Sequence, residues 1–538
     1  MYKTILDGIW QFGFTEGDCA DPLSIPTTTV AAVPGCYDAG ELFSKRGFGV
    51  YRRTVDCGGI VRLSFSGGLN IHVFWDGKEV GSSVLPYTLE HYEFNAGKQG
   101  NHELAIVADN RFLGTEEEIF KSYYDFYGYG GIYSHVELEQ IDDETITRVQ
   151  VTPIDVATGT VEIAIEFPDK PKKADITIAF DGGKREKVSY TKPIRRKVPN
   201  FKVWSPSSPA LHTVTVSRDG YSRNTTFGIR TLEWHGGVLK LNGQPIKLLG
   251  YCRHESHPDF GAATPLAVIR NDLVKIKQQG CNFIRGSHYP QREEMLDICD
   301  EIGLLVWDES MGWNNEENAF THPEFQRRQV EQTVKMVRNS YNHPSVIIWG
   351  FLNELHSEAT TARDIVGQLV YAIHANDASR PATFASNRTV RDVTLDLLDI
   401  ISFNTYPGWY DPGMPVSGIS NVRPKLKRES KWATEGDFAD KPLIISEIGA
   451  GSFLGDHSGV RWSEEYQAEL IAEILKVVYG NPRFTGIAFW QYCNCRTYID
   501  GPINGRPRGF NNKGVLDEYR RPKMAWFTIR DFAQKHKF

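Results

Sequence analysis

The chain has 538 residues, a mass of 60.8 kDa and a formal net charge of −7 at pH 7. This length exceeds what one hydrophobic core usually supports, so we expect two to four domains. Sixty basic residues against 67 acidic ones create no general attraction for nucleic acid or for an anionic membrane, so neither is an expected partner. Hydrophobic residues make up 41% of the chain and charged residues 24%, which excludes extensive disorder.

The first residues and the cysteines indicate the compartment. The opening MYKTILDGIWQFGF has no basic stretch followed by a continuous apolar run, and no later run is long enough to cross a bilayer. The eight cysteines lack paired CxxC spacing, and Cys493 and Cys495 form a CxC on a strand-like segment, where alternate residues merely share a face. Free thiols are therefore favoured over a zinc site. We predict a cytoplasmic protein without metal or cofactor.

Residues 1–142 consist of short alternating or apolar runs cut by Gly, Asn and Asp, such as VRLSFSG, IHVFWDG and HELAIVAD. This pattern predicts an antiparallel β-sandwich. Asp76 and Gly77 lie between two strand-like pieces, which predicts a hairpin because a type I′ turn needs positive φ angles.

Residues 143–230 form a second all-β stretch with runs such as GTVEIAIEF and ADITIAFDGG. About seven short segments in roughly 90 residues are typical of an immunoglobulin-like sandwich. Neither this stretch nor the first contains a convincing long helix.

From residue 231 to residue 538, strand-like runs alternate with helical ones. In TPLAVIRNDLVKIKQQG, Thr264 is the expected N-cap and Pro265 the first helical residue. Leu266, Ile269, Leu273 and Ile276 recur at helical spacing, and Gly280 ends the helix. Further helices are expected at about 292–302, 323–341, 360–376, 463–479 and 523–536.

Eight candidate strands separate these helices, which predicts a (β/α)₈ TIM barrel. They are IKLLGYC, NFIRGSH, LLVWDES, SVIIWGFLNE, TFASN, DIISFNTY, PLIISEIG and GIAFWQYC. The expected fold class is therefore multidomain, with two β-sandwiches before an α/β barrel.

Two carboxylates stand at the C-terminal ends of apolar, β-branched runs: Glu354 in GFLNE and Glu447 in IISEIG. In a barrel both would lie at the same rim, and a carboxylate pair is the minimal equipment for hydrolysing a glycosidic bond. A desolvated Glu354 could keep a raised pKa and act as the acid, whereas Glu447 must be ionised, with Arg285 and Tyr406 as candidate supports. Strands four and seven of so narrow a barrel predict the carboxyl separation of roughly 5–5.5 Å that a retaining mechanism needs.

Other polar residues also follow the predicted strands. Any one of them is more often a buried, satisfied group than a functional one, but their joint arrival at one rim predicts an active site. They are Arg253, His254, Glu255, Arg285, His288, Asp308, Glu309, Asn353, Asn404, Tyr406 and Trp490.

Several long blocks make the chain resemble glycoside hydrolase family 2, among them NFIRGSHYPQREEMLDICDEIGLLVWDE, NHPSVIIWGFLNE and PLIISEIGAG. The family joins a jelly-roll sugar-binding domain, an immunoglobulin-like domain and a catalytic barrel. The resemblance implies that Glu354 is the general acid/base, Glu447 the nucleophile and Asn353 a contact to the sugar 2-hydroxyl. It also implies a jelly roll at 1–142, with Asp125 in DFYGYGGIYSHVEL as a hydroxyl acceptor. His254, His288, Asn404, Tyr406 and Trp490 are the expected lining of the sugar subsite.

The string RPRGFNNKG points to the sugar. Asn511 and Lys513 match the Asn-x-Lys element with which β-glucuronidases of this family hold the substrate carboxylate. A lysine ammonium beside a carboxylate gives a charge-assisted hydrogen bond, whereas a neutral sugar would leave it unpaired. The alternative is one more solvated loop lysine. NTYPGWYDP also resembles the glucuronidase block, with Tyr410 as a pocket aromatic.

One departure from that pattern concerns the 4-hydroxyl of the sugar. Pro507 stands where glucuronidases carry an arginine, and its neighbours Arg506 and Arg508 are both candidate substitutes, of which we select Arg508 as a supporting residue. We expect a retaining, exo-acting hydrolase of β-D-uronides, with glucuronide favoured over its 4-epimer, galacturonide. A β-galactosidase would use a divalent metal and would not need Lys513.

From a different class, a non-catalytic carbohydrate-binding protein is the alternative. The short segment after the third strand, ESMGWNNEENAFTHPEFQ, predicts an open aglycone side. A homo-oligomer, either a dimer or a tetramer, is expected.

Overall fold

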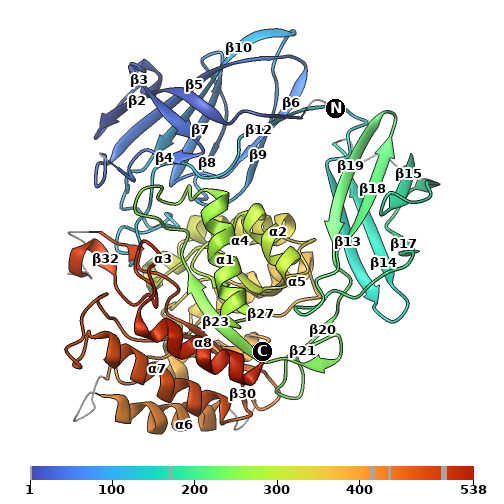
Figure 1. Ribbon diagram of the computed structural model, residues 1–538. Helices are drawn as coiled ribbons and strands as arrows, with labels where there is room; N and C mark the ends of the chain where they lie inside the picture. The colour runs from blue at the N-terminus through green and yellow to red at the C-terminus, as the bar shows by residue number, and fades with distance from the viewer. Residues whose placement is uncertain (1–2, 41, 169–172, 412–417, 434–437, 499–505) are drawn as a thin grey trace.

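A computed structural model describes residues 3–40, 42–168, 173–411, 418–433, 438–498 and 506–538. Figure 1 shows three parts: a sandwich in blue, a second sandwich in green and a barrel that runs from green to red. The predicted fold class is confirmed. The predicted domain limits, 142 and 230, fall in the connections that follow β12 and β19, and the limits themselves stay predictions.

The first part is built on two large sheets. One has the order β1-β12-β6-β9 and the other the order β3-β2-β5-β10-β7-β8. Side chains from both sheets, including Trp10, Leu63, Val73 and Leu138, form one buried core. The strands are β1 Lys3–Ile5, β2 Gly8–Glu16, β3 Thr29–Val33, β5 Gly47–Cys57, β6 Ile60–Phe65, β7 Asn70–Trp75, β8 Lys78–Ser83, β9 Glu90–Asn95, β10 Gly100–Asp109 and β12 Glu137–Ile141, with the short pair β4 Gly35–Cys36 and β11 Gly131–Ile132.

The predicted hairpin is confirmed. Strand β7 pairs with β8 so that Trp75 lies opposite Lys78, and the two residues between them have positive φ angles, 49° at Asp76 and 78° at Gly77. A positive φ is what a two-residue hairpin turn requires.

The second part contains seven strands in its described residues, as expected, in sheets of order β13-β14-β17 and β16-β15-β18-β19. Alternating apolar residues such as Val161, Ile163 and Ile176 meet between the two sheets. The strands are β13 Arg148–Asp155, β14 Thr160–Glu166, β15 Ala174–Phe180, β16 Glu186–Tyr190, β17 Ile194–Lys197, β18 His212–Arg218 and β19 Tyr221–Phe227. A small sheet of β20 Leu232–Glu233, β21 Lys240–Leu241 and β22 Gln244–Pro245 leads into the barrel.

The third part is an eight-stranded parallel sheet of order β27-β26-β25-β24-β23-β30-β29-β28. A parallel bridge between Ser386 and Phe403 joins its two ends, so the sheet closes into a barrel. Each strand is almost entirely buried, because its inner face fills the barrel and its outer face meets the helices. The strands are β23 Leu248–Arg253, β24 Phe283–Gly286, β25 Leu305–Glu309, β26 Val346–Gly350, β27 Ala382–Thr383, β28 Ile401–Asn404, β29 Leu443–Ile448 and β30 Phe484–Phe489.

The helices surround this barrel (Figure 1). They are α1 Leu266–Gln279, α2 Glu293–Ile302, α3 Glu317–Phe320, α4 Pro323–Asn339, α5 Ala362–Asn376, α6 Val422–Trp432, α7 Glu464–Tyr479 and α8 Met524–His536. Within the described ranges, none of the helices has the length and apolarity required to span a membrane.

The predicted start of α1 is wrong by one residue. Pro265 is the N-cap and Leu266 the first helical residue, while the hydroxyl of Thr264 donates to the carbonyl of Gly261 instead of capping the helix. The predicted end is right, since Gly280 closes the helix with a φ of 99°. Leu266 is 41% exposed and so does not belong to the buried face expected of it.

The first sandwich and the barrel share a core. Tyr124, Phe126 and Tyr129, which follow β10, belong to the same buried cluster as the interior of the barrel. The amide of Tyr127 donates to the carbonyl of Arg496 at 3.0 Å, and the amide of Gly128 donates to the hydroxyl of Tyr498 at 2.8 Å. The segment that carries Asp125 is thereby fixed against the loops that follow β30.

Candidate active site

Glu447 lies near the C-terminal end of β29 and is 3% exposed. Its Oε1 accepts a hydrogen bond from Nη1 of Arg285 at 2.8 Å, and its Oε2 accepts one from the hydroxyl of Tyr406 at 2.6 Å. Nε2 of His288 lies 3.7 Å from Oε1. Arg285 and Tyr406 thus orient both oxygens of the Glu447 carboxylate, as a nucleophile in a fixed position requires.

Arg285 extends from β24 and is completely buried. Its Nε and Nη2 donate to the two carboxylate oxygens of Glu309, both at 2.9 Å, and Nη2 also donates to Oδ1 of Asn353 at 2.9 Å. Glu309 in addition lies 2.9 Å from Nδ1 of His288. Burial, only partly offset by Arg285, raises the pKa of Glu309 to about 7. Glu309 thus holds Arg285 and His288, two of the three groups around Glu447.

The sequence placed Glu309 among the strand-end residues of the predicted active site but gave it no individual role. Its position at the end of β25, in VWDE, carried the signal. The strand-end pattern included Glu309, but the resemblance assigned it no role.

Glu354 follows β26 and has a left-handed backbone, with a φ of 56°. Its Oε1 accepts a hydrogen bond from Nδ2 of Asn404 at 2.8 Å. Burial first, and then the negative charge of Glu447, raise the pKa of Glu354 to about 7. A carboxyl with this pKa still carries a proton near neutral pH and can donate it.

A chain of hydrogen bonds connects the two carboxylates. Asn404 donates to Glu354 and to Oδ1 of Asn353, and that same oxygen accepts from Arg285, which donates to Glu447. Nδ2 of Asn353 has no hydrogen-bond partner among the described residues, so it remains able to bind a sugar hydroxyl. The two carboxylates therefore belong to one site, and their predicted separation stays a prediction.

Trp490 and two histidines form an adjacent wall. The Trp490 ring stacks on His288, with centroids 5.2 Å apart, and meets His254 edge-on at 5.3 Å. Burial holds the pKa of both histidines well below its ordinary value, so both rings are neutral. In the part of the chain that the structure describes, Nε2 of each histidine lacks a hydrogen-bond partner. Neutral imidazoles with a free ring nitrogen suit the recognition of sugar hydroxyls.

Lys513 follows the short strand β32 Phe510–Asn511 and is 3% exposed. Its ammonium donates to the hydroxyl of Tyr410 at 2.9 Å and lies 5.6 Å from the ring centroid of Tyr406. Burial, followed by the charge of Arg506, lowers the pKa of Lys513. It forms no ion pair with any carboxylate of the described ranges. A buried cation without a counter-charge is costly, and a bound anion would relieve that cost.

Asp125 and Arg506 form an ion pair beside Lys513. The carboxylate accepts two hydrogen bonds from Arg506, one from Nε at 3.1 Å and one from Nη2, and a third from Nδ2 of Asn511 at 3.0 Å. Nη1 of Arg506 donates to the hydroxyl of Tyr410 at 3.2 Å. Burial raises the pKa of Tyr410, but the charges of Lys513 and Arg506 outweigh it and lower the pKa to about 8.

Arg508 lies elsewhere, which corrects its selection as the supporting arginine. Its guanidinium donates to the carboxylate of Glu518 at 2.9 Å and to Oδ1 of Asn512 at 2.8 Å, and its side chain is 51% exposed. The two residues also differ in the backbone, since Arg506 is extended, with a φ of −64°, and Arg508 is left-handed, with a φ of 64°. Of the two arginines beside Pro507, Arg506 is the one that reaches Asp125 and Tyr410.

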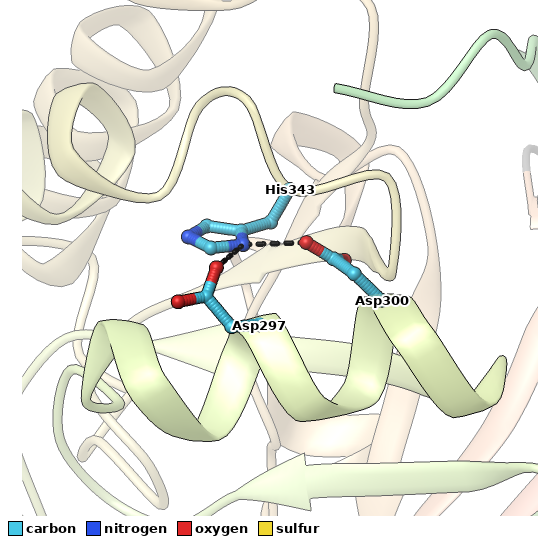
Figure 2. Close-up of side chains that lie close together, drawn as sticks. All are labelled: Asp297, Asp300 and His343. Atoms are coloured by element: carbon cyan, nitrogen blue, oxygen red, sulfur yellow. Dashed lines mark hydrogen bonds and ion pairs between the residues drawn. The ribbon is translucent and has the colours of Figure 1, made fainter. Parts of the chain in front are cut away.

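One cluster outside this site could in principle hold a metal ion. Figure 2 shows the ring of His343 between the carboxylates of Asp297 and Asp300, both on α2. Nδ1 of His343 lies 2.7 Å from Asp300 and 3.8 Å from Asp297. Although burial lowers the pKa of His343, its attraction to Asp300 raises that pKa to about 9. The imidazole is therefore protonated and shares its proton with Asp300, which makes the cluster an ion pair and a poor metal site.

Asp297 also lines a polar cleft of about 390 Å³ between the two sandwiches and α2. None of the predicted site residues lines this cleft. Its arginines are occupied, for example Arg223 by Glu139 and Arg338 by Glu166. The cleft thus separates domains and lies apart from the carboxylate pair.

The family model for the TIM barrel domain of glycosyl hydrolases family 2 matches residues 232–538. The β-glucuronidase of Streptococcus agalactiae is 28% identical over 475 residues, which cover 81% of this chain and 76% of that protein. The β-glucuronidase of Rattus norvegicus is 29% identical over 431 residues, and the match spans 76% of this chain and 64%, less than two thirds, of the rat protein.

Solved structures extend the likeness to the whole chain. A family 2 β-galacturonidase from Eisenbergiella tayi, bound to galacturonate, is 31% identical with a TM-score of 0.90, covering 99% of this chain and 97% of that one. A β-glucuronidase from Faecalibacterium prausnitzii is 25% identical with a TM-score of 0.87, covering 99% of this chain and 98% of that one.

Proposed function

The chain belongs to glycosyl hydrolase family 2, and we propose that it is a retaining, exo-acting hydrolase that removes a terminal β-linked D-uronic acid from a conjugate or an oligosaccharide. One observation carries the proposal. The buried ammonium of Lys513 lies over the ring of Tyr406, and the hydroxyl of Tyr406 binds Glu447. A site for an anion therefore adjoins the carboxylate that is suited to attack a sugar.

In the proposed mechanism, Glu354 protonates the glycosidic oxygen while the carboxylate of Glu447 attacks the anomeric carbon. The bond to the leaving group breaks and a covalent glycosyl ester of Glu447 forms. Glu354, now ionised, removes a proton from water, which attacks the same carbon and releases Glu447. The raised pKa of Glu354 supports its part, since its proton is present near neutral pH and is regained in each cycle.

Lys513 supports the choice of a uronic acid. A carboxylate at C5 of the sugar would meet an ammonium that has only Tyr410 as a hydrogen-bond partner in the described ranges. The hydroxymethyl group of a neutral sugar would leave that charge without a counter-ion. The relatives and neighbours named above act on β-glucuronides or β-galacturonides according to their names, which agrees with this assignment.

Glucuronide is the proposed substrate, and galacturonide is the second candidate. The two sugars differ in the direction of the 4-hydroxyl alone. The β-glucuronidases among the curated relatives favour glucuronide. The pairing of Arg506 with Asp125 next to Pro507, a departure from the glucuronidase pattern, favours the second candidate, as does the likeness to the E. tayi enzyme.

Side-by-side assays of 4-nitrophenyl β-D-glucuronide, β-D-galacturonide and β-D-galactoside test the proposal. We expect turnover of at least one uronide with a kcat/KM well above that of the galactoside. Glu447→Gln serves as the control and should abolish turnover while uronate binding survives. A preference for the galactoside, or no turnover of any of the three by the unmodified protein, would refute the proposal.

We also propose a reducing compartment such as the cytoplasm, because all eight cysteines are free. We also propose a homo-oligomer, a dimer or a tetramer, and light scattering coupled to gel filtration would measure its mass.

A further inference from the structure

Lys523 precedes α8, and its side chain is completely buried. Its ammonium donates three hydrogen bonds: to the carbonyl of Ser452 at 2.8 Å, to Oδ1 of Asn494 at 3.2 Å and to the carbonyl of Asn512 at 3.2 Å. A lysine ammonium has three donors, so these three acceptors satisfy it. All three acceptors are uncharged, and Lys523 forms no ion pair within the described ranges.

The three acceptors belong to three different segments of the barrel rim. Ser452 follows β29, the strand that carries Glu447; Asn494 follows β30; and Asn512 is the middle residue of the Asn511–Lys513 turn. Two further bonds support this junction, from the amide of Ser452 to the carbonyl of Asn512 at 3.0 Å and from the amide of Gly514 to Oδ1 of Asn494 at 3.1 Å. Lys523 therefore ties the turn to the segments on both sides of it.

The turn is also held at Lys513 itself. The carbonyl of Lys513 accepts from the amide of Gln491 at 3.1 Å and from Nε2 of Gln467 at 3.3 Å. With Lys523 bound at the preceding carbonyl, two successive peptide units of the turn are fixed. The side chain of Lys513 is then left free to project toward Tyr406 and Tyr410.

Burying the ammonium of Lys523 costs free energy, although the ammonium binds only three uncharged carbonyl oxygens. Burial lowers the pKa of Lys523 to about 7, which reflects the cost of keeping an ammonium in this place. Arg253, another buried cation, has Glu255 and Asp272 as counter-ions, whereas Lys523 has no such partner among the residues that the structure describes. Apolar replacements of buried ions are often neutral or stabilising, so stability alone does not account for this lysine.

We propose that Lys523 is a positioning residue that fixes the main chain of the Asn511–Lys513 turn, so that the ammonium of Lys513 faces the carboxylate of the sugar. This inference rests on the proposed function, because it assumes that Lys513 binds a uronate. Lys523 itself does not contact the sugar. It acts on substrate selectivity through the geometry of Lys513.

Lys523→Met tests the inference, since methionine has similar length and no donors. We would measure kcat and KM on 4-nitrophenyl β-glucuronide and β-galacturonide and on the corresponding neutral glucoside and galactoside. The uronide KM should rise by about tenfold or more, as for other supports that orient a binding group, with a smaller fall in kcat. The kcat/KM of the neutral substrates should change by less than about threefold.

Lys277→Met is the matched control. The ammonium of Lys277 also donates to carbonyl groups, those of Pro206 and Gly303, both at 2.8 Å, but it joins the barrel to the second sandwich. This variant should lower the melting temperature without changing the ratio of uronide to neutral activity. Should Lys523→Met fail to fold, Asn494→Ala removes one acceptor of Lys523 and should shift the same ratio in the same direction, by a smaller factor.

Equal losses on uronide and neutral substrates in Lys523→Met would overturn the inference, as would an unchanged ratio in Asn494→Ala where that variant has to take its place. An equal change of the ratio in Lys277→Met would also overturn it, because any loss of rigidity would then suffice. These outcomes leave the proposed function intact when the unmodified protein prefers uronides. No preference for uronides in the unmodified protein overturns the proposed function, and this inference with it.

Discussion

Around Glu447 the buried charges are mostly acidic, whereas around Lys513 they are mostly basic. On the first side, Arg285 pairs with both Glu309 and Glu447, and the charge of Glu447 contributes to the raised pKa of Glu354. On the second side, the cations Lys513 and Arg506 have Asp125 as their one carboxylate in the described ranges. In the proposed function, the first side supplies the groups for proton transfer and attack, and the second side binds the carboxylate of the sugar.

This separation of charges explains how one rim of the barrel could bind an acidic sugar next to two acidic residues. A uronate would be repelled by Glu354 and Glu447 if the cations were distributed evenly. Lys513 and Arg506 both bind Tyr410, so in the proposed binding mode the sugar carboxylate would have one preferred orientation. The anomeric carbon is then directed toward the acidic side.

Loss of Glu447 would remove the reactive group of the acidic side and should have the largest effect. We expect Glu447→Ala to lower kcat by at least about a thousandfold, because the proposed covalent intermediate forms on this carboxylate. Azide should restore part of the turnover and yield a glycosyl azide of inverted configuration, which proton NMR of the product identifies. Asp297 belongs to the His343 cluster and not to the carboxylate pair, so the control Asp297→Asn should leave kcat unaffected. Failure of azide to give the inverted product would contradict the nucleophilic role of Glu447.

Loss of Lys513 would remove a cation from the basic side of the rim. Lys513→Met should lower kcat/KM for uronides by about 10- to 150-fold, the range that corresponds to a charged hydrogen bond of roughly 1.5–3 kcal/mol. Neutral glycosides should lose far less, and steady-state kinetics on both substrate types measures the difference. Similar losses on the two would show that the ammonium has no role toward a substrate carboxylate.

Glu309→Gln would weaken the anchoring of Arg285 and would leave the groups proposed to contact the substrate unchanged. The amide keeps the size of the carboxylate but removes the charge that anchors two guanidinium nitrogens, so we expect a fall in kcat of about 10- to 100-fold with little change in KM. Stopped-time assays at saturating uronide would measure it. If KM rose and kcat stayed the same, Glu309 would act on binding instead of on Glu447.

The pH profile should show the smallest effect of the four. Glu354 has to be protonated to act as the acid, so kcat/KM should fall as the pH rises through about 7, the pKa that burial and Glu447 impose on it. Glu354→Gln, assayed with a nitrophenyl leaving group that needs little protonation, should lose this basic limb. A basic limb that persists in the variant would assign the titration to another group, such as Tyr410 with its pKa of about 8.

Much of the barrel could be predicted from the sequence because its strands are buried on both faces and are therefore continuous apolar runs. The same property marked Glu354 and Glu447, since each ends such a run. Helix α6 was not predicted, because VRPKLKRESKW buries only a narrow face of Val422, Leu426, Glu429 and Ser430 and carries many charges. Periodicity is a weak signal in so polar a helix.

The partner of Asp125 could not be predicted in the same way. Arg506 lies 381 positions away from Asp125 in the sequence. The residue types around Pro507 also do not indicate that Arg508 has a left-handed backbone, so they do not distinguish Arg506 from Arg508. Glu309 shows the opposite limit. Its position at the rim could be predicted, but its role depends on the geometry of Arg285 and His288, which appears only when β24 and β25 are placed side by side.

Asp125 comes from the first sandwich, although the groups that it joins come from the barrel. In the proposed binding mode, recognition of the sugar is thus divided between two folding units that residues 143–230 separate in the sequence. An isolated barrel fragment would retain both catalytic candidates yet present Arg506 and Asn511 without their shared acceptor. Exchange of the N-terminal sandwich between relatives is consequently a route by which this architecture could change its sugar preference while its chemistry stays the same.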